Sequence, residues 1–112
     1  MSSHLSHLTF DCEDAAALAG FWGAVLGAPI DGEATPDFAV VKGDPGWMFI
    51  KVPEGKAAKN RVHPDLTASD LQGEVDRLVA LGATRQAEHD EEGTRWVTLS
   101  DPEGNEFDIV AA

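Results

Sequence analysis

A weak internal repeat with a period of about 56 residues constrains the fold of this chain more than any other feature. Two strand-like stretches that begin with histidine, His7 to Asp14 and His63 to Asp70, each run into an acidic helix start. Both following helices end in the same three residues, Leu26-Gly27-Ala28 and Leu81-Gly82-Ala83. An Asp-Pro turn then precedes the final strand of each half, beginning at Asp44 and Asp101. Three features in the same order predict a duplicated unit with pseudo-twofold symmetry.

Each half carries one helix pattern. In the first half, Asp14 is the expected cap, and bulky residues recur at helical spacing along one stripe, which is Leu18, Phe21, Trp22, Val25 and Leu26. In the second half, Ser69 and Gln72 stand at capping-box spacing. Gly27 and Gly82 supply the left-handed residue that ends a helix. The pattern predicts helices over residues 14–26 and 70–81.

Alternation and β-branched or aromatic content predict the strands, at residues 5–12, 29–34, 38–42, 47–52, 61–67, 85–90, 95–100 and 106–110. Each half therefore reads strand, helix and three strands. This order predicts an α+β fold of two βαβββ modules, in which curved mixed sheets surround a concave site and the helices cover the outer face. We expect a single domain over residues 1–112, with module one at 4–53, a connector at 54–60 and module two at 61–112.

Composition restricts the cellular setting and the partners. The single cysteine, Cys12, excludes an internal disulfide framework, and residues 1–6 do not resemble a secretory signal, so a cytoplasmic protein is expected. The uncharged run from Ala15 to Ile30 is too short for a membrane span and indicates a buried helix. A formal charge of −12 disfavours nucleic acid and anionic membranes as partners. Half of the basic residues lie within 51–61, which indicates either a solvated linker or an anion-steering rim.

Strand alternation assigns side chains to the two faces of each sheet. We expect one face to pack on the helices, with Leu8, Phe10, Cys12, Val62, Pro64, Leu66, Ala68, Phe107 and Ile109. The opposite face then lines the concavity, with His7, Thr9, Asp11, His63, Asp65, Thr67, Glu106, Asp108 and Val110. His7, His63 and Asp108 occupy repeat-related positions in this second set. Two histidines and one carboxylate make a facial triad that leaves metal positions open, although a polar sheet face is also common without any metal.

Three segments resemble glyoxalase-like domains of the vicinal-oxygen-chelate superfamily, which includes glyoxalase, bleomycin-resistance and extradiol-dioxygenase proteins. They are the helix at 14–27 with its Phe21-Trp22 and closing Leu26-Gly27, the connector region 52–66, and the turn at 101–107. The resemblance covers nearly the whole chain. It implies one divalent metal (Fe, Mn, Ni or Zn), held by His7, His63 and Asp108, and it implies pairing into a homodimer.

The resemblance also implies a fourth ligand position, which falls on Ile50, four residues after Gly46 as Asp108 is four after Gly104. Isoleucine cannot bind a metal, and this argues against a glyoxalase I reaction, which needs a carboxylate there. The remaining triad resembles that of extradiol dioxygenases, except that Asp108 is shorter than their glutamate and the chain has no tyrosine for proton transfer.

Three functional interpretations remain open. The first is a metal-assisted enzyme of lyase, isomerase or dioxygenase type that acts on a small oxygenated substrate. The second is a metal-free binder of an antibiotic-like or aromatic molecule, for which Trp96 and Thr98, with Met48 and Ile50, suit an apolar ligand. The third is a protein with no surviving site. In the first two cases the predicted pocket residues are Thr9, Asp11, Ile50, Asp65, Thr67, Trp96 and Glu106. Trp22 and Trp47 are expected in the core.

Overall fold

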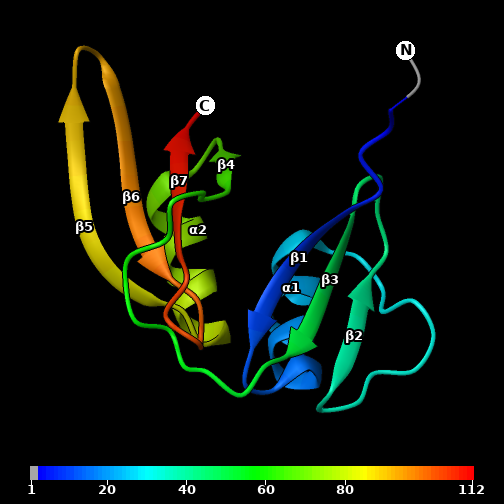
Figure 1. Cartoon of the computed structure of the whole chain (residues 1–112). Coiled ribbons are helices and arrows are strands. Elements are labelled where there is room, and N and C mark those ends of the chain that lie inside the picture. Colours follow the sequence, from blue (N-terminus) through cyan, green and yellow to red (C-terminus); the bar gives the residue numbers. More distant parts are fainter. Residues whose placement is uncertain (1–2) are drawn as a thin grey trace. The chain divides into compact units, whose positions relative to one another are not determined.

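The computed structural model describes residues 3–112, which form two compact units that meet in sequence between Gly55 and Lys56 (Figure 1). Each unit contains one mixed sheet and one helix. The α+β class and the two-module architecture are therefore confirmed.

The first unit contains β1 (His7–Cys12), α1 (Ala15–Leu26), β2 (Phe38–Val41) and β3 (Gly46–Lys51). Its sheet has the order β1-β3-β2, with β1 parallel and β2 antiparallel to β3. Helix α1 covers one face of this sheet (Figure 1). Phe10, Trp22, Trp47 and Phe49 form an aromatic core, in which the Trp22 ring lies 4.9 Å from Trp47 and 6.2 Å from Phe10. The core role predicted for Trp22 is confirmed because its side chain is fully buried, whereas Trp47 is half-buried and packs against the Trp22 ring.

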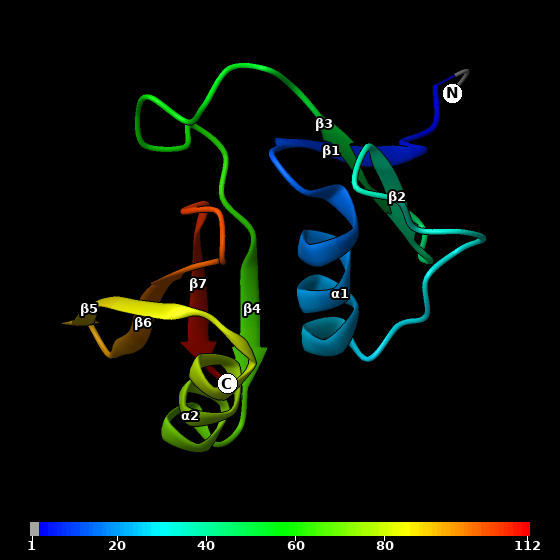
Figure 2. The same ribbon diagram turned by 90° about the horizontal axis from the view of Figure 1, so that it is seen from below.

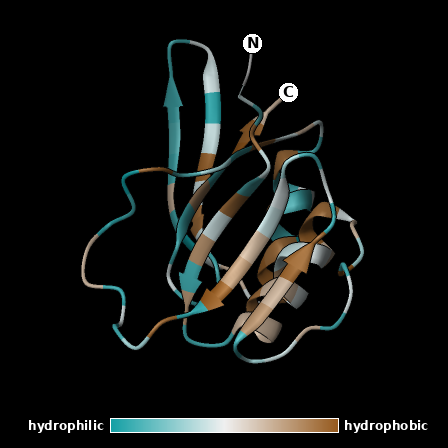
Figure 3. Cartoon of the chain, turned by 45° about the vertical axis from the view of Figure 1, so that its right-hand side comes forward, coloured by the Kyte–Doolittle hydropathy of each residue, from teal (hydrophilic) through white to brown (hydrophobic). Residues whose placement is uncertain are grey.

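The second unit contains β4 (Asp65–Ala68), α2 (Leu71–Leu81), β5 (Thr84–Glu91), β6 (Thr94–Ser100) and β7 (Glu106–Ala111). Its sheet has the order β4-β7-β6-β5, and the only parallel pair among these strands is β4 with β7. Figure 3 shows that β5, at the edge of this sheet, is hydrophilic along most of its length. A polar edge strand protects a sheet from pairing with other chains.

Local signals set the helix ends. Asp14 caps α1 by accepting a hydrogen bond from the Ala17 N–H, and Gly27 ends that helix with a left-handed φ of 63°. In α2 the expected capping box at Ser69 is wrong, because Asp70 is the cap and its carboxylate accepts from the Gly73 N–H at 3.0 Å. In residues 3–112 no helix is long and apolar enough to cross a membrane.

Two predicted strands differ from the structure. Residues 29–34 form only a single bridge, from Ile30 to Val41, and Gly32 then turns the chain with a φ of 77°. The strand expected at 61–67 begins only at Asp65. Val62 is consequently 82% exposed instead of packing inward. Leu8 of β1, which was also expected to pack on the helix, is 37% exposed. In the last strand the predicted inward positions are confirmed, since Phe107 and Ile109 are fully buried.

Candidate functional site

The parallel pairing of β4 and β7 creates the main polar site of the second unit. Phe107 and Ile109 are buried, so the alternate residues of β7, including Asp108, point to the opposite face of the sheet. The register pairs Asp65 of β4 directly with Asp108. Figure 2 shows these two strands lying side by side.

His63 joins the two carboxylates although it precedes the strand. The N–H of Asp108 donates to the carbonyl of Pro64 at 3.0 Å, which holds the chain beside β7 just before β4 begins. The Nδ1 atom of His63 lies 3.0 Å from Asp65 Oδ1 and 3.6 Å from Asp108 Oδ2. All three side chains offer a ligand atom within 4.8 Å of one another.

Asp108 is the best-supported member of this cluster. Thr98 pairs with it across β6 and β7 and donates its hydroxyl proton to Asp108 Oδ1 at 2.6 Å. The Asp108 side chain is 16% exposed, whereas those of His63 and Asp65 are 41% and 58% exposed. The hydroxyl therefore fixes one oxygen of Asp108 and leaves the second oxygen facing His63.

The donor set fits a divalent metal. Nitrogen and oxygen ligands bind at about 2.0–2.2 Å, so neighbouring ligand atoms around one ion lie about 3.0–3.5 Å apart. The separations of 3.0 and 3.6 Å around His63 Nδ1 are close to this spacing. An imidazole with carboxylates suits iron, manganese, nickel and zinc.

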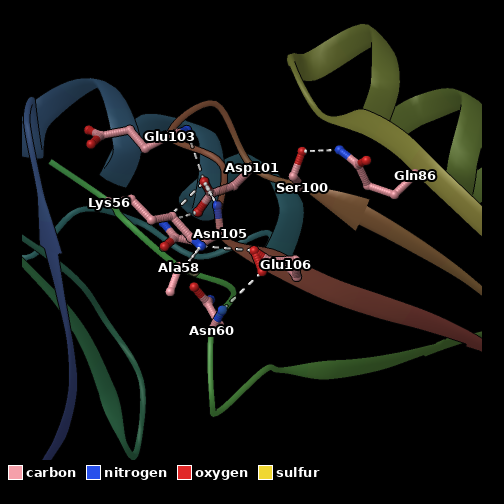
Figure 4. A network of polar contacts seen from close by, with 9 residues as sticks. All are labelled: Lys56, Ala58, Asn60, Gln86, Ser100, Asp101, Glu103, Asn105 and Glu106. Atoms are coloured by element: carbon pink, nitrogen blue, oxygen red, sulfur yellow. Dashed lines mark hydrogen bonds and ion pairs between the residues drawn. The ribbon is translucent and has the colours of Figure 1, made fainter.

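Glu106 has a different role from the pocket role predicted for it. One of its carboxylate oxygens lies 3.0 Å from Lys56 Nζ, and the other accepts from the Asn60 N–H at 3.1 Å (Figure 4). Lys56 also donates to the carbonyl of Ala58. Glu106 thus fastens the connector to the start of β7. Lys56, one of the four basic residues of the stretch 51–61, is thus an ion-pair partner within the second unit.

These contacts change the acidity of Glu106. Burial by itself raises the pKa of this carboxyl, but the Asn60 N–H and the Lys56 ammonium together outweigh burial and lower the pKa below its ordinary 4.5. Folding therefore gains stability from ionised Glu106 above about pH 4.5, and this gain is lost as the pH falls through the lower folded value.

Replacing Glu106 by glutamine is expected to lower stability at pH 7 and to leave it unchanged in acid. Glutamine keeps an oxygen for Asn60 but loses the charge that Lys56 neutralises. Urea unfolding of both proteins between pH 3 and pH 7 measures the difference, with the exposed Glu91→Gln as the charge-matched control. A stability difference that is constant over this range would contradict the assignment.

In the first unit, His7 stands where β1 meets β3. It pairs with Gly46, and a side chain at that glycine would place its Cβ only 2.9 Å from His7 Cδ2 and 3.3 Å from Nε2. The absence of a side chain at Gly46 therefore makes room for the imidazole. The Nδ1 atom of His7 is hydrogen-bonded to the Ser6 hydroxyl at 2.7 Å, so Nε2 is the nitrogen suited to a metal.

The registers of the two units identify the counterpart of Asp108. In the second unit, Asp108 pairs with the residue two positions after His63. In the first unit, the residue two positions after His7 is Thr9, and Thr9 pairs with Met48. Ile50 pairs instead with Asp11, as Val110 pairs with Thr67. By sheet register, therefore, Met48 and not Ile50 is the counterpart of Asp108 in the first unit, and a thioether is a poor ligand for hard divalent ions.

The other predicted pocket residues lie on the expected strands. Thr9, Asp11 and Ile50 are exposed on the first sheet, and Thr67 is exposed on β4. Trp96 is half-buried and stacks on His89 of β5, with ring centroids 4.8 Å apart. A depression of about 510 Å³ at the start of α2 includes Thr67 but none of His63, Asp65 or Asp108.

Within the second unit the structure brings together His63 and Asp108, as the sequence predicts, and adds Asp65 to them. Sequence reasoning assigned Asp65 to the pocket wall and missed its place beside the candidate ligands. Its spacing of two from His63 was visible, but its pairing with Asp108 depends on strand register.

Comparisons with known proteins agree with this architecture. The sequence model of a family described as "Glyoxalase-like domain" matches residues 7–110. No curated protein sequence matches the chain.

Several solved structures share the fold at low identity. A glyoxalase/bleomycin resistance protein/dioxygenase family enzyme from Burkholderia phytofirmans PsJN is 18% identical, with a TM-score of 0.80 and coverage of 97% of this chain and 98% of that one. The fosfomycin resistance protein FosX from Mesorhizobium loti is 19% identical, with a TM-score of 0.77 and coverage of 100% and 94%. A mutant of FosX from Listeria monocytogenes, complexed with Mn(II) and 1S,2S-dihydroxypropylphosphonic acid, is 16% identical, with a TM-score of 0.80 and coverage of 100% and 92%.

Proposed function

Because this chain belongs to the glyoxalase-like domain family of the vicinal-oxygen-chelate superfamily, we propose that it is a metal-dependent enzyme acting on a small oxygenated substrate. In this proposal one divalent ion is held by His7 from the first module and by His63 and Asp108 from the second. The observation that carries it is the approach of Asp108 to His63 at 3.6 Å, with Thr98 orienting the carboxylate. A Mn(II) complex is known for one structural neighbour, the Listeria FosX mutant.

The roles of the residues follow from their contacts. When bound, the metal would act as a Lewis acid that polarises a substrate oxygen. Thr98 holds Asp108 in one orientation, and Gly46 leaves the space that the His7 ring needs. Three protein ligands leave positions for a bidentate substrate. A glyoxalase I reaction is not proposed, because neither Met48 nor Ile50 can supply the required carboxylate base.

A second candidate function is metal-free binding of an apolar or aromatic molecule. Phe38 and Ile50 form a directly paired and exposed apolar couple on the first sheet, with 44% and 36% of their surfaces exposed. The Trp96–His89 stack offers aromatic surface on the second sheet. These features favour sequestration of a ligand if no metal binds.

Metal titration tests the proposal. We expect chelator-treated protein to bind one Mn²⁺, Ni²⁺, Zn²⁺ or, anaerobically, Fe²⁺ per chain in calorimetry. Gly46→Ala should weaken binding by about tenfold, because the new Cβ displaces His7 without removing any ligand. Gly20→Ala is the matched control, since its Cβ would meet nothing within 4 Å. Failure of the wild type to bind any of these ions would favour the metal-free function. If Gly46→Ala binds the ion as tightly as the wild type does, His7 is not a ligand.

Homodimerisation and a cytoplasmic location stay predictions. Three small residues of α1, Ala17, Gly20 and Ala24, are exposed and could pack closely against a partner chain, whereas Gly23 is buried next to the carbonyl of Ala28.

A further inference from the structure

We propose that Asp65 is a direct metal ligand alongside His63 and Asp108. This inference rests on the proposed metal site and adds to it a residue that the superfamily pattern does not predict. It would give the second module three of the protein ligands and offset the missing carboxylate at Met48.

The argument begins with the imidazole of His63. Both carboxylates approach the same ring nitrogen, with Asp65 Oδ1 at 3.0 Å and Asp108 Oδ2 at 3.6 Å from Nδ1. An ion shared by His63 Nδ1 and Asp108 Oδ2 would lie on the Nδ1 side of the ring and would replace the hydrogen bond between that nitrogen and Asp65. That position is also next to Asp65 Oδ1, which is the closer of the two oxygens. In this geometry an ion near both His63 Nδ1 and Asp108 Oδ2 would also lie near Asp65 Oδ1.

Charge supports the same conclusion. Asp65 and Asp108 are register partners on adjacent parallel strands, so two ionised carboxylates at these positions repel each other. Other acidic residues of this unit have basic partners, since Glu74 pairs with Arg77 and Glu106 pairs with Lys56. Within residues 3–112, neither Asp65 nor Asp108 forms an ion pair with lysine or arginine, and His63 is their shared neighbour. A divalent cation would neutralise both carboxylates.

Exposure permits this role. The Asp65 side chain is 58% exposed and takes no part in the buried core, so it can rotate toward an ion. All three ligand atoms lie within 4.8 Å of one another, and rotation of the exposed Asp65 side chain can shorten these separations toward coordination spacing.

Asp65→Asn provides the test, because asparagine keeps an oxygen that can accept the hydrogen bond from His63 but has no charge. We expect the affinity for Mn²⁺ in calorimetry to fall about 10-fold to 100-fold. The visible absorption of bound Co²⁺ should also change, since it reports the ligands of the ion. The charge-matched control is Asp90→Asn, an exposed residue next to His89 on β5, which should bind as the wild type does.

The outcomes separate this inference from the proposed function. If the wild type binds the ion and Asp65→Asn binds it equally well with an unchanged Co²⁺ spectrum, Asp65 only orients His63 and the inference is wrong while the metal site stands. If the wild type binds no ion, both fail. Lower affinity in Asp65→Asn, with normal affinity in Asp90→Asn, supports the inference.

Discussion

Asp108→Asn is expected to lower the affinity for Mn²⁺ by about 100-fold or more. Removal of residues that only support metal ligands already costs about 10-fold to 100-fold, and Asp108 is proposed as a ligand itself. Asparagine matches the shape of aspartate and can still accept the Thr98 hydroxyl that now lies 2.6 Å from Oδ1. The loss would therefore come from the missing charge and not from a rearranged sheet. Calorimetric titration measures it directly.

The free energy of unfolding provides a second, independent test of the Asp108→Asn prediction. Without metal, Asp108→Asn should be as stable as the wild type or more stable, because one of two facing carboxylates loses its charge. With Mn²⁺ at about 100 times the dissociation constant, the wild type should gain about 2.7 kcal/mol, and the variant should gain almost nothing. Thermal unfolding with and without Mn²⁺ shows whether this is so.

Asp101→Asn is the matched control for Asp108→Asn. The buried Asp101 carboxylate accepts hydrogen bonds from the N–H groups of Glu103 and Asn105 and from the Asn105 side chain (Figure 4). An amide there turns a donor toward other donors, so stability should fall by about 1–3 kcal/mol while the affinity for Mn²⁺ is kept. If the Asp108 and Asp101 variants bind Mn²⁺ with equal affinity, Asp108 is not a metal ligand.

Helices were predictable because their signals are local. Asp14 and the glycines at 27 and 82 act within one turn of the helix they begin or end, so the predicted spans are within one residue of those observed. The choice of Ser69 over Asp70 as a cap failed because neighbouring residues can both serve as caps, and only the backbone decides which side chain meets the N–H of Gly73.

Strand limits were less predictable because they depend on partners elsewhere in the chain. Pro64 cannot donate a hydrogen bond, and the backbone N–H of Asn60, just before the predicted strand, donates to the side chain of Glu106 instead of to a neighbouring strand. Ile30 has the residue type of a strand, but Gly32 turns the chain away from β2 after one bridge. Neither contact can be read from the sequence around the strand itself.

The candidate site likewise combines residues that short segments predict with residues that depend on distant strand partners. His63 and Asp108 follow from alternation and from their places in the repeat, which are properties of short segments. Asp65 and Met48 depend on which residue of one strand faces which residue of another, and a shift of two residues exchanges Met48 for Ile50. The number of residues after Gly46 or Gly104 does not determine this pairing, because Gly46 is the first residue of β3 whereas Gly104 lies two residues before β7 begins.

Met48→Glu is therefore expected to raise the affinity for Mn²⁺ by about tenfold or more, by returning a carboxylate to the register position that matches Asp108. Met48 is half-buried, so the new carboxylate should destabilise the metal-free protein, and Mn²⁺ should restore its stability. Both effects can be measured by calorimetry and by thermal unfolding with and without the ion.

Ile50→Glu is the matched control, since it adds the same side chain on the same face of β3. It lies two residues further along the strand, about 6.6 Å away, and pairs with Asp11 instead of Thr9. We expect it to leave the affinity for Mn²⁺ unchanged and to lower stability slightly through repulsion with Asp11. If Ile50→Glu strengthens Mn²⁺ binding and Met48→Glu does not, the spacing from the turn glycines would locate the fourth ligand and the register equivalence of the two modules would be wrong. If both variants bind Mn²⁺ as the wild type does, the first module supplies no ligand from β3, and the ion would depend on the second module with or without His7.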